Sequence, residues 1–103
     1  MKVVYTPEAV PPLPVFSQAT ISRGYVYVSG TIGILHDLKT IVPGGVQAQT
    51  QQALENMQKV LKAAVYIQFF DKDKMPARTC VGVATLPLGA DFEIECVAEI
   101  PDN

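Results

Sequence analysis

The chain has 103 residues, of which 49% are apolar and 17% are charged, and its formal net charge at pH 7 is -2. A chain of this length is expected to form one compact domain, and because small domains bury a modest share of their surface, burial against another subunit would help it. The acidic balance, without any cluster of Lys and Arg, excludes nucleic acid and anionic membranes as default partners.

The sequence also argues against a metal centre, a leader peptide and a membrane anchor. Cys80 and Cys96 are the only thiols and His36 is the only imidazole, and their spacing does not suit a zinc site. The N-terminal apolar stretch is too short for a signal peptide, and no apolar run reaches membrane-spanning length. We therefore expect a cytoplasmic protein with reduced thiols, and neither a metal ion nor a cofactor.

The first predicted elements are a proline-rich lead-in and a β-hairpin. Four prolines within 7–16 fix φ and remove backbone donors, so this segment is expected to be extended and irregular. Two β-rich stretches, SQATIS and YVYVSG, flank Arg23 and Gly24, and Gly24 can adopt a positive φ. A hairpin follows, and 31–36 (TIGILH) is a candidate continuing strand that ends at the Pro-Gly-Gly sequence of 43–45.

The hydrophobic period changes after residue 45. Apolar or small residues then recur at three- and four-residue steps, while Gln, Glu and Lys occupy the opposite side. The positions on the apolar side are Val46, Thr50, Ala53, Leu54, Met57, Val60, Leu61 and Ala64. This pattern predicts an amphipathic helix with one buried face.

The last predicted feature is a pair of strands at 79–86 and 91–99, joined by a turn at 86–90. In the second strand apolar and acidic residues alternate, which gives one apolar face and one acidic face. Three β stretches, a helix and a closing hairpin together predict an α+β domain, with a helix packed on one face of a mainly antiparallel sheet.

Four stretches carry a more specific signal. They are FSQA at 16–19, YVSGTIG at 27–33, PGGVQAQTQQALENMQKVLKAA at 43–64 and PARTCVGVATLPLGADFEIECVA at 76–98. In this order they resemble the RidA (YjgF, L-PSP) family of reactive intermediate imine deaminases. The resemblance covers nearly the whole chain as a single domain, 1–103. It implies a chorismate-mutase-like (YjgF/L-PSP) fold and a homotrimer with ligand sites in the clefts between subunits.

The sequence departs from the family pattern at three places. Phe16 stands where the family has a Tyr whose hydroxyl helps to order the ligand, and Thr31 stands where Gln is common. After Ala64 the family places a further strand of about 6 residues and about a dozen more residues of helix, which are absent here. A true deletion and an incomplete sequence are both open. Loss of an interior strand would leave backbone unpaired and a core face exposed, which favours the second explanation.

The resemblance implies hydrolysis of enamines and imines of the 2-aminoacrylate type to 2-oxo acids and ammonia, the reaction of a 2-iminobutanoate/2-iminopropanoate deaminase. Such a substrate carries a carboxylate beside a C=N carbon, and a guanidinium offers that carboxylate a two-pronged fit. A second group must hold and deprotonate water, which a carboxylate can do. We assign these roles to Arg78 and Glu93. Further candidate binding residues are Cys80, Ser29 and Gly30, through backbone groups, and Phe16 and Ile32, as apolar walls.

The predicted C-terminal hairpin has a consequence for this pair of residues. If the two strands pair around their turn, Ala84 lies opposite Glu93, and Arg78 lies six residues further on, roughly 20 Å along the strand. Arg78 would then not reach Glu93 of its own chain. The spacing therefore favours a site in which the two groups come from different chains.

Each assignment has an ordinary structural alternative. Arg78 can be a solvated residue at a strand start, and Glu93 an exposed strand carboxylate, with Glu95 the competing choice for its role. Cys80 can be a small core residue, and Ser29 and its neighbouring glycine can simply end a strand.

Two other functions also stay open. One is the endoribonuclease or translation-inhibitor role that the L-PSP name implies, against which the acidic balance stands. The other is a non-catalytic, small-carboxylate-binding or chaperone-like trimer, which needs no Glu93.

Overall fold

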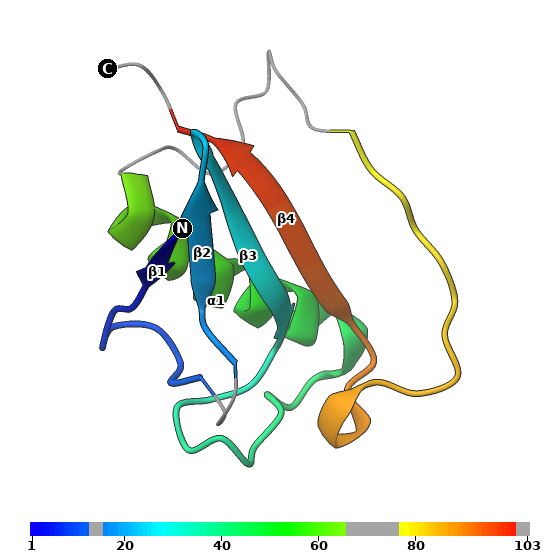
Figure 1. The fold of residues 1–103 in the computed structure, drawn as a ribbon. Coiled ribbons are helices and arrows are strands. Elements are labelled where there is room, and N and C mark those ends of the chain that lie inside the picture. The colour runs from blue at the N-terminus through cyan, green and yellow to red at the C-terminus, as the bar shows by residue number, and fades with distance from the viewer. Residues whose placement is uncertain (13–15, 66–76, 101–103) are drawn as a thin grey trace.

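The structure is a computed structural model, and it describes residues 1–12, 16–65 and 77–100. The strands are β1 (Lys2–Val4), β2 (Ala19–Ser22), β3 (Tyr25–Ile32) and β4 (Glu93–Glu99). The helices are α1 (Gly45–Val65) and a short 3-10 turn at Pro87–Gly89. The strands form one sheet in the order β1-β2-β3-β4, with every neighbouring pair antiparallel, and α1 covers one face (Figure 1). The predicted α+β class is confirmed.

The predicted hairpin is β2–β3. Its register runs from Ala19 opposite Val28 to Ser22 opposite Tyr25, which leaves a two-residue turn of Arg23 and Gly24. Both turn residues have positive φ, 52° and 84°. Two positive φ values in a two-residue turn match the right-handed twist of the flanking strands, which is why a glycine is favoured there. The candidate strand at 31–36 is shorter than predicted, because β3 ends at Ile32 and only an isolated bridge, from Ile34, follows.

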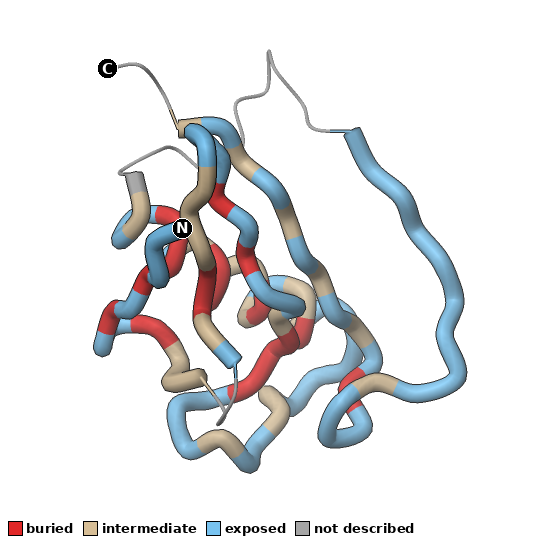
Figure 2. Tube along the Cα trace, in the orientation of Figure 1, coloured by how far each residue is buried: buried red, intermediate tan, exposed pale blue. Residues whose placement is uncertain are grey.

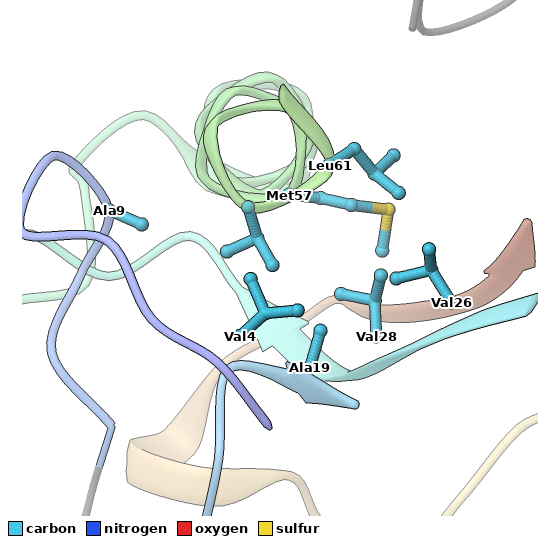
Figure 3. Packing of buried hydrophobic residues seen from close by; sticks show 8 residues of the cluster. Val4, Ala9, Ala19, Val26, Val28, Met57 and Leu61 are labelled. Carbon is cyan, nitrogen blue, oxygen red and sulfur yellow. The ribbon is translucent and has the colours of Figure 1, made fainter. Parts of the chain in front are cut away.

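The core lies between α1 and the inner face of the sheet. Met57 and Leu61 of α1 point at Val26 and Val28 of β3 (Figure 3), and Met57 and Val26 are fully buried. The remaining buried members of this cluster are Val4, Ala9, Ala19 and Val60. Figure 2 shows the buried residues gathered where helix and sheet meet. The amphipathic pattern of 46–64 therefore predicted the helix correctly, but its buried face only in part. Val46 is 51% exposed and Thr50 and Leu54 are half-buried, whereas the polar Gln49 and Asn56 are buried.

Two contacts fix the end of β3 against α1. The buried Asn56 donates from its amide to the carbonyl oxygens of Ile32 and Ile34, at 3.1 and 3.0 Å. At Gly33 the backbones approach so closely that an added Cβ would lie 2.6 Å from the carbonyl oxygen of Gln49. A residue without a side chain is therefore required at this crossing.

The predicted strand at 79–86 is wrong. Residues 77–85 are extended but form no strand, every one of them is exposed, and Figure 1 shows this segment (yellow) on the far side of β4 from β3. β4 starts at Glu93 and pairs with β3 instead. The sequence pattern favoured a strand, but strand formation also requires a hydrogen-bonding neighbour, and among the described residues this segment has none.

The predicted junction between Ala64 and Val65 falls at the end of α1. Residues 66–76 lie outside the described part of the chain. Among the described residues no helix is long and apolar enough to cross a membrane.

Candidate functional site

The outer face of the sheet, opposite α1, carries an exposed apolar row. The register places Val3, Thr20, Tyr27 and Val97 side by side across the four strands. Residues directly opposite each other in antiparallel strands share a face. Val3, Tyr27 and Val97 are 56%, 46% and 61% exposed, so this row is apolar and uncovered in the single chain, while the rest of the outward side of β4 is acidic.

A hollow of about 380 Å³ lies on this outer face. Its lining residues are Phe16, Ser17, Thr20, Tyr27, Val28, Ser29, Glu95, Cys96 and Val97. Two residues predicted as binding residues, Phe16 and Ser29, thus come together here. Tyr27 and Val97 also line the hollow but were not predicted as site residues. The alternation of β3 and β4 would have assigned both to the face opposite the helix.

Ser29 and Gly30 form an irregularity in β3. Val28 pairs with Cys96 and Thr31 with Ile94, so two residues of β3 lie opposite one residue of β4. An extra residue of this kind bends a strand and redirects its side chains.

Hydrogen bonds hold this bulge in place. Ser29 donates from its backbone amide to the Gln18 carbonyl at 3.1 Å, and from Oγ to the Ser17 carbonyl at 2.5 Å. The predicted role of Ser29 was to present backbone groups to the substrate. Its amide is already used within the chain.

Glu93 lies directly over Gly30. A Cβ added at Gly30 would lie 2.9 Å from Glu93 Oε2 and 3.0 Å from its Cδ, so the carboxylate occupies the space that any side chain at position 30 would need. Glu93 is exposed, at the first position of β4. The structure therefore brings together Gly30 and Glu93. The Glu93 carboxylate packs against the bare backbone of Gly30 and remains accessible to water.

A hydrogen-bonded pair positions the segment just before Glu93. Gln49 of α1 donates from Nε2 to Asp91 Oδ2 at 3.0 Å and accepts from the Asp91 backbone amide at 2.8 Å. Gln49 is buried, so both bonds are partly shielded from water. These two bonds hold Asp91 against α1, two residues before Glu93, the candidate catalytic carboxylate.

Two predicted site residues, Arg78 and Cys80, are not brought into the hollow of the single chain, and a third, Ile32, is paired opposite Glu93 but is buried. Arg78 and Cys80 are exposed on segment 77–85 and do not line the hollow, and Ile32 is buried in a small cluster with Ile34 and Ala90. Ile32 is therefore a core residue and not the exposed apolar wall that was predicted. The register argument that separated Arg78 from Glu93 also falls, because the hairpin on which it rested is not formed.

The lining of the hollow includes one acidic group and one thiol. Glu95 contributes a carboxylate to its lining. Burial, followed by the negative charge of Glu95, raises the pKa of the Cys96 thiol. Among the described residues no three His, Cys, Asp or Glu side chains form a group that could hold a metal ion.

Comparison with known proteins identifies the family to which the chain is similar. The model of the family described as Endoribonuclease L-PSP matches residues 6–66 and 62–100. A RutC family protein of Drosophila melanogaster is 38% identical over 122 residues, and the match covers 94% of this chain and 88% of that protein. The 2-iminobutanoate/2-iminopropanoate deaminase of Homo sapiens is 34% identical, with the same coverages.

A solved structure agrees with these matches. A Rid family protein from Yersinia pestis superposes with a TM-score of 0.85 at 31% identity, covering 96% of this chain and 98% of that one. The alignment with the Drosophila melanogaster protein is 122 positions long, but the 94% of this chain that it covers is only about 97 of 103 residues. Some aligned positions therefore have no residue in this chain. The two family-model matches meet at residues 62–66, near the end of α1.

The fold, the motif residues at the β3 bulge and β4, and the family-model match over 6–66 and 62–100 all agree. The chain belongs to the RidA (YjgF, L-PSP) family.

Proposed function

We propose that this protein hydrolyses small 2-imino and 2-enamino acids, of the 2-aminoacrylate type, to 2-oxo acids and ammonia. The observation that carries the proposal is the exposed Glu93 carboxylate, held over the side-chain-free Gly30, whose neighbour Ser29 lines a hollow together with Phe16. Relatives named 2-iminobutanoate/2-iminopropanoate deaminase, at 32–34% identity, support the reaction class.

In this proposal Glu93 acts on water. An exposed carboxylate can accept a proton from a water molecule while the water oxygen attacks the C=N carbon. The proton passes to the nitrogen and gives a carbinolamine, which carries a hydroxyl and an amino group on the same carbon. Transfer of the hydroxyl proton to the amino nitrogen, again through the carboxylate, lets the C–N bond break, so that ammonia leaves as the C=O bond forms. Glu95 is the competing carboxylate, because it lines the hollow and Glu93 does not.

Arg78 is proposed to bind the substrate carboxylate. Its guanidinium can form two parallel hydrogen bonds with a carboxylate, a geometry that an ammonium group cannot reproduce. Because segment 77–85 lies on the far side of β4 from β3, Arg78 is better placed to reach a site on another copy than the hollow of its own chain (Figure 1).

The proposed assembly is a homotrimer that buries the outer face of the sheet. Val3, Tyr27 and Val97, together with Phe16 and Tyr25, form an exposed apolar surface of a kind that usually marks an interaction site. Burial of this face would place the hollow of one copy against its neighbour. We also infer a cytoplasmic location, since both cysteines are free thiols and reduced thiols are typical of that compartment.

The test is imine hydrolysis by the purified protein, with the substrate generated by a pyridoxal-phosphate dehydratase and 2-oxo acid release followed by absorbance. The protein should accelerate release, Arg78→Ala should lose most of the acceleration, and Arg78→Lys should not restore it. Glu93→Gln should lower kcat, whereas Glu95→Gln should retain it. Equal rates for the protein and its Arg78→Ala variant would remove the proposal.

The family description also carries the endoribonuclease name, which is the one observation in favour of a second function. The net charge of -2 opposes it, because nucleic-acid affinity is dominated by contacts between cations and phosphates. RNA binding that is strong and weakens steeply with salt would favour the ribonuclease role over the deaminase.

A further inference from the structure

We propose that two copies of this chain pair by exchanging segment 77–85, which each copy adds as a strand to the free edge of β4 in the other. The partner is thus a second copy of the chain, and the contact runs along one edge of the sheet. It leaves free the outer face that the proposed trimer would bury, and it does not depend on the proposed function.

The free edge of β4 is the acceptor. β4 pairs with β3 along one edge, and within 1–12, 16–65 and 77–100 no residue pairs with its other edge. Such an edge presents a row of unpaired amide and carbonyl groups, which is a template for one more strand. The side chains of Ile94, Cys96 and Ala98 pack on the core cluster here but are only half-buried. A further strand would cover them.

Segment 77–85 is the donor. It forms no strand and every residue in it is exposed, with Val81 at 72% and Val83 at 58%. β-Branched residues favour strands, and they occupy every second position of this segment, at Thr79, Val81, Val83 and Thr85. The segment therefore has the composition and alternation of a strand, but it has no pairing partner in the part of the chain that the structure describes.

The turn that follows the segment holds it away from β4 of its own chain. Leu86 packs on the small core cluster that contains Ala90, and Asp91 is bonded twice to Gln49 of α1. Both ends of the turn are thus anchored, and Figure 1 shows the segment (yellow) running apart from β4. Closure within one chain would require these anchored residues to move, whereas a second copy meets an edge that is already open.

A two-fold axis makes the exchange reciprocal. The order across the joined sheets is then β4, the partner's segment, the chain's own segment and the partner's β4. Each segment has a strand on both sides and both free edges are used, so assembly closes at two copies and does not grow into a filament. This order agrees with the single chain, in which the segment lies apart from β4, on the side away from β3 (Figure 1).

Charge favours the segment over β4 itself as the occupant of the edge. The exposed side chains of β4 include Glu93, Glu95 and Glu99. In the full-length antiparallel register of two β4 strands, Glu93 of each copy would lie opposite Glu99 of the other, and like charges in such pairs are destabilising. Segment 77–85 carries a single charged residue, Arg78, so its pairing with β4 brings a positive charge to an acidic strand.

The experiment follows molar mass by light scattering, and amide hydrogen exchange, of the whole chain over a wide range of protein concentration. The disrupting variant carries Val81→Pro and Val83→Pro, which remove two amide donors from the segment. Both residues are exposed in the single chain, so its fold should persist. The matched control is Val46→Pro, at an exposed valine in the first turn of α1, where proline is tolerated. Val3→Lys is the control for assembly through the outer face.

Raising the concentration of the unaltered chain should slow exchange by about tenfold or more in segment 77–85 and at the β4 amides that do not point towards β3. At high concentration its molar mass should be twice that of the double-proline variant, which should show no such protection. Val46→Pro should behave as the unaltered chain does. Val3→Lys should keep the protection, because the contact does not use the outer face.

Protection that does not depend on concentration would overturn the proposal, since the chain would then close its own edge. Protection of β4 without segment 77–85 would also overturn it, because two β4 edges would then be paired. So would protection that Val3→Lys removes, protection that survives both prolines, or no protection at any concentration. None of these measurements uses substrate, so a lack of imine hydrolysis would count against the proposed function alone.

Discussion

A methyl group at position 30 tests the role of the Glu93 carboxylate without altering Glu93 itself. The Cβ of Gly30→Ala would lie 2.9 Å from Glu93 Oε2 and 3.0 Å from Cδ, contacts that are too short to persist. The carboxylate must move by several tenths of an ångström or change rotamer, at a cost of about 0.5–1.5 kcal/mol. Because Glu93 is an exposed, flexible side chain, the free energy of unfolding should change by no more than this.

Activity should respond much more strongly than stability. A displacement of about 1 Å in a catalytic group can reduce the rate about a hundredfold. We therefore expect kcat/KM for imine hydrolysis to fall by about tenfold to a hundredfold in Gly30→Ala, with a thermal midpoint close to that of the unaltered chain. The control is Gly82→Ala, since a Cβ at Gly82 meets nothing within 4 Å.

A double-mutant comparison separates a specific effect from a general one. In a Glu93→Ala background the methyl group at position 30 has no carboxylate to displace, so Gly30→Ala should have no further effect on the residual rate. The reasoning is refuted if Gly30→Ala lowers activity equally with and without Glu93. It is also refuted if Gly30→Ala retains full activity.

Three further predictions concern other parts of the chain. Gly33→Ala should lower the free energy of unfolding by about 1–3 kcal/mol or more, because its Cβ would lie 2.6 Å from the carbonyl oxygen of Gln49. A urea titration measures this change, and an unchanged midpoint would contradict the close approach of the two backbones. Iodoacetamide should label exposed Cys80 well before Cys96, whose thiol pKa is raised by burial, as peptide mass spectrometry would show; equal rates would contradict this. Asp37 should titrate near pH 2 by carboxyl NMR, because the Thr40 hydroxyl and two backbone amides lower its pKa from 3.8 to about 2. The turn is therefore fully stabilised above about pH 4 and loses this stabilisation as pH falls through about 2, and a midpoint near 3.8 would contradict it.

Elements whose signal lies within their own sequence were predicted well. The hairpin at Arg23 and Gly24 follows from two β-rich stretches around residues that accept positive φ, and α1 follows from its apolar period. Segment 77–85 has an equally clear strand pattern, but whether it pairs depends on a neighbour that its own residues do not encode. β1, three residues long, had no periodic signal to detect.

The same distinction between local and long-range signals applies to the residues of the candidate site. The contact between Gly30 and Glu93 depends on the bulge in β3, because only there do two residues lie opposite one of β4, and no local pattern marks the bulge. The link from Gln49 to Asp91 joins positions 42 residues apart and becomes visible only in three dimensions. Motif resemblance pointed to Glu93 without indicating what holds its carboxylate.

The central claim is that two chains build one site from Arg78 and Glu93. Its most direct test is to co-express the Arg78→Ala and Glu93→Gln variants with different tags and to purify assemblies that carry both. In a mixed ring of three, one interface joins an intact Arg78 to an intact Glu93, so such assemblies should recover about a third of the activity of the unaltered protein. Activity no higher than that of either variant alone would contradict a site shared between chains.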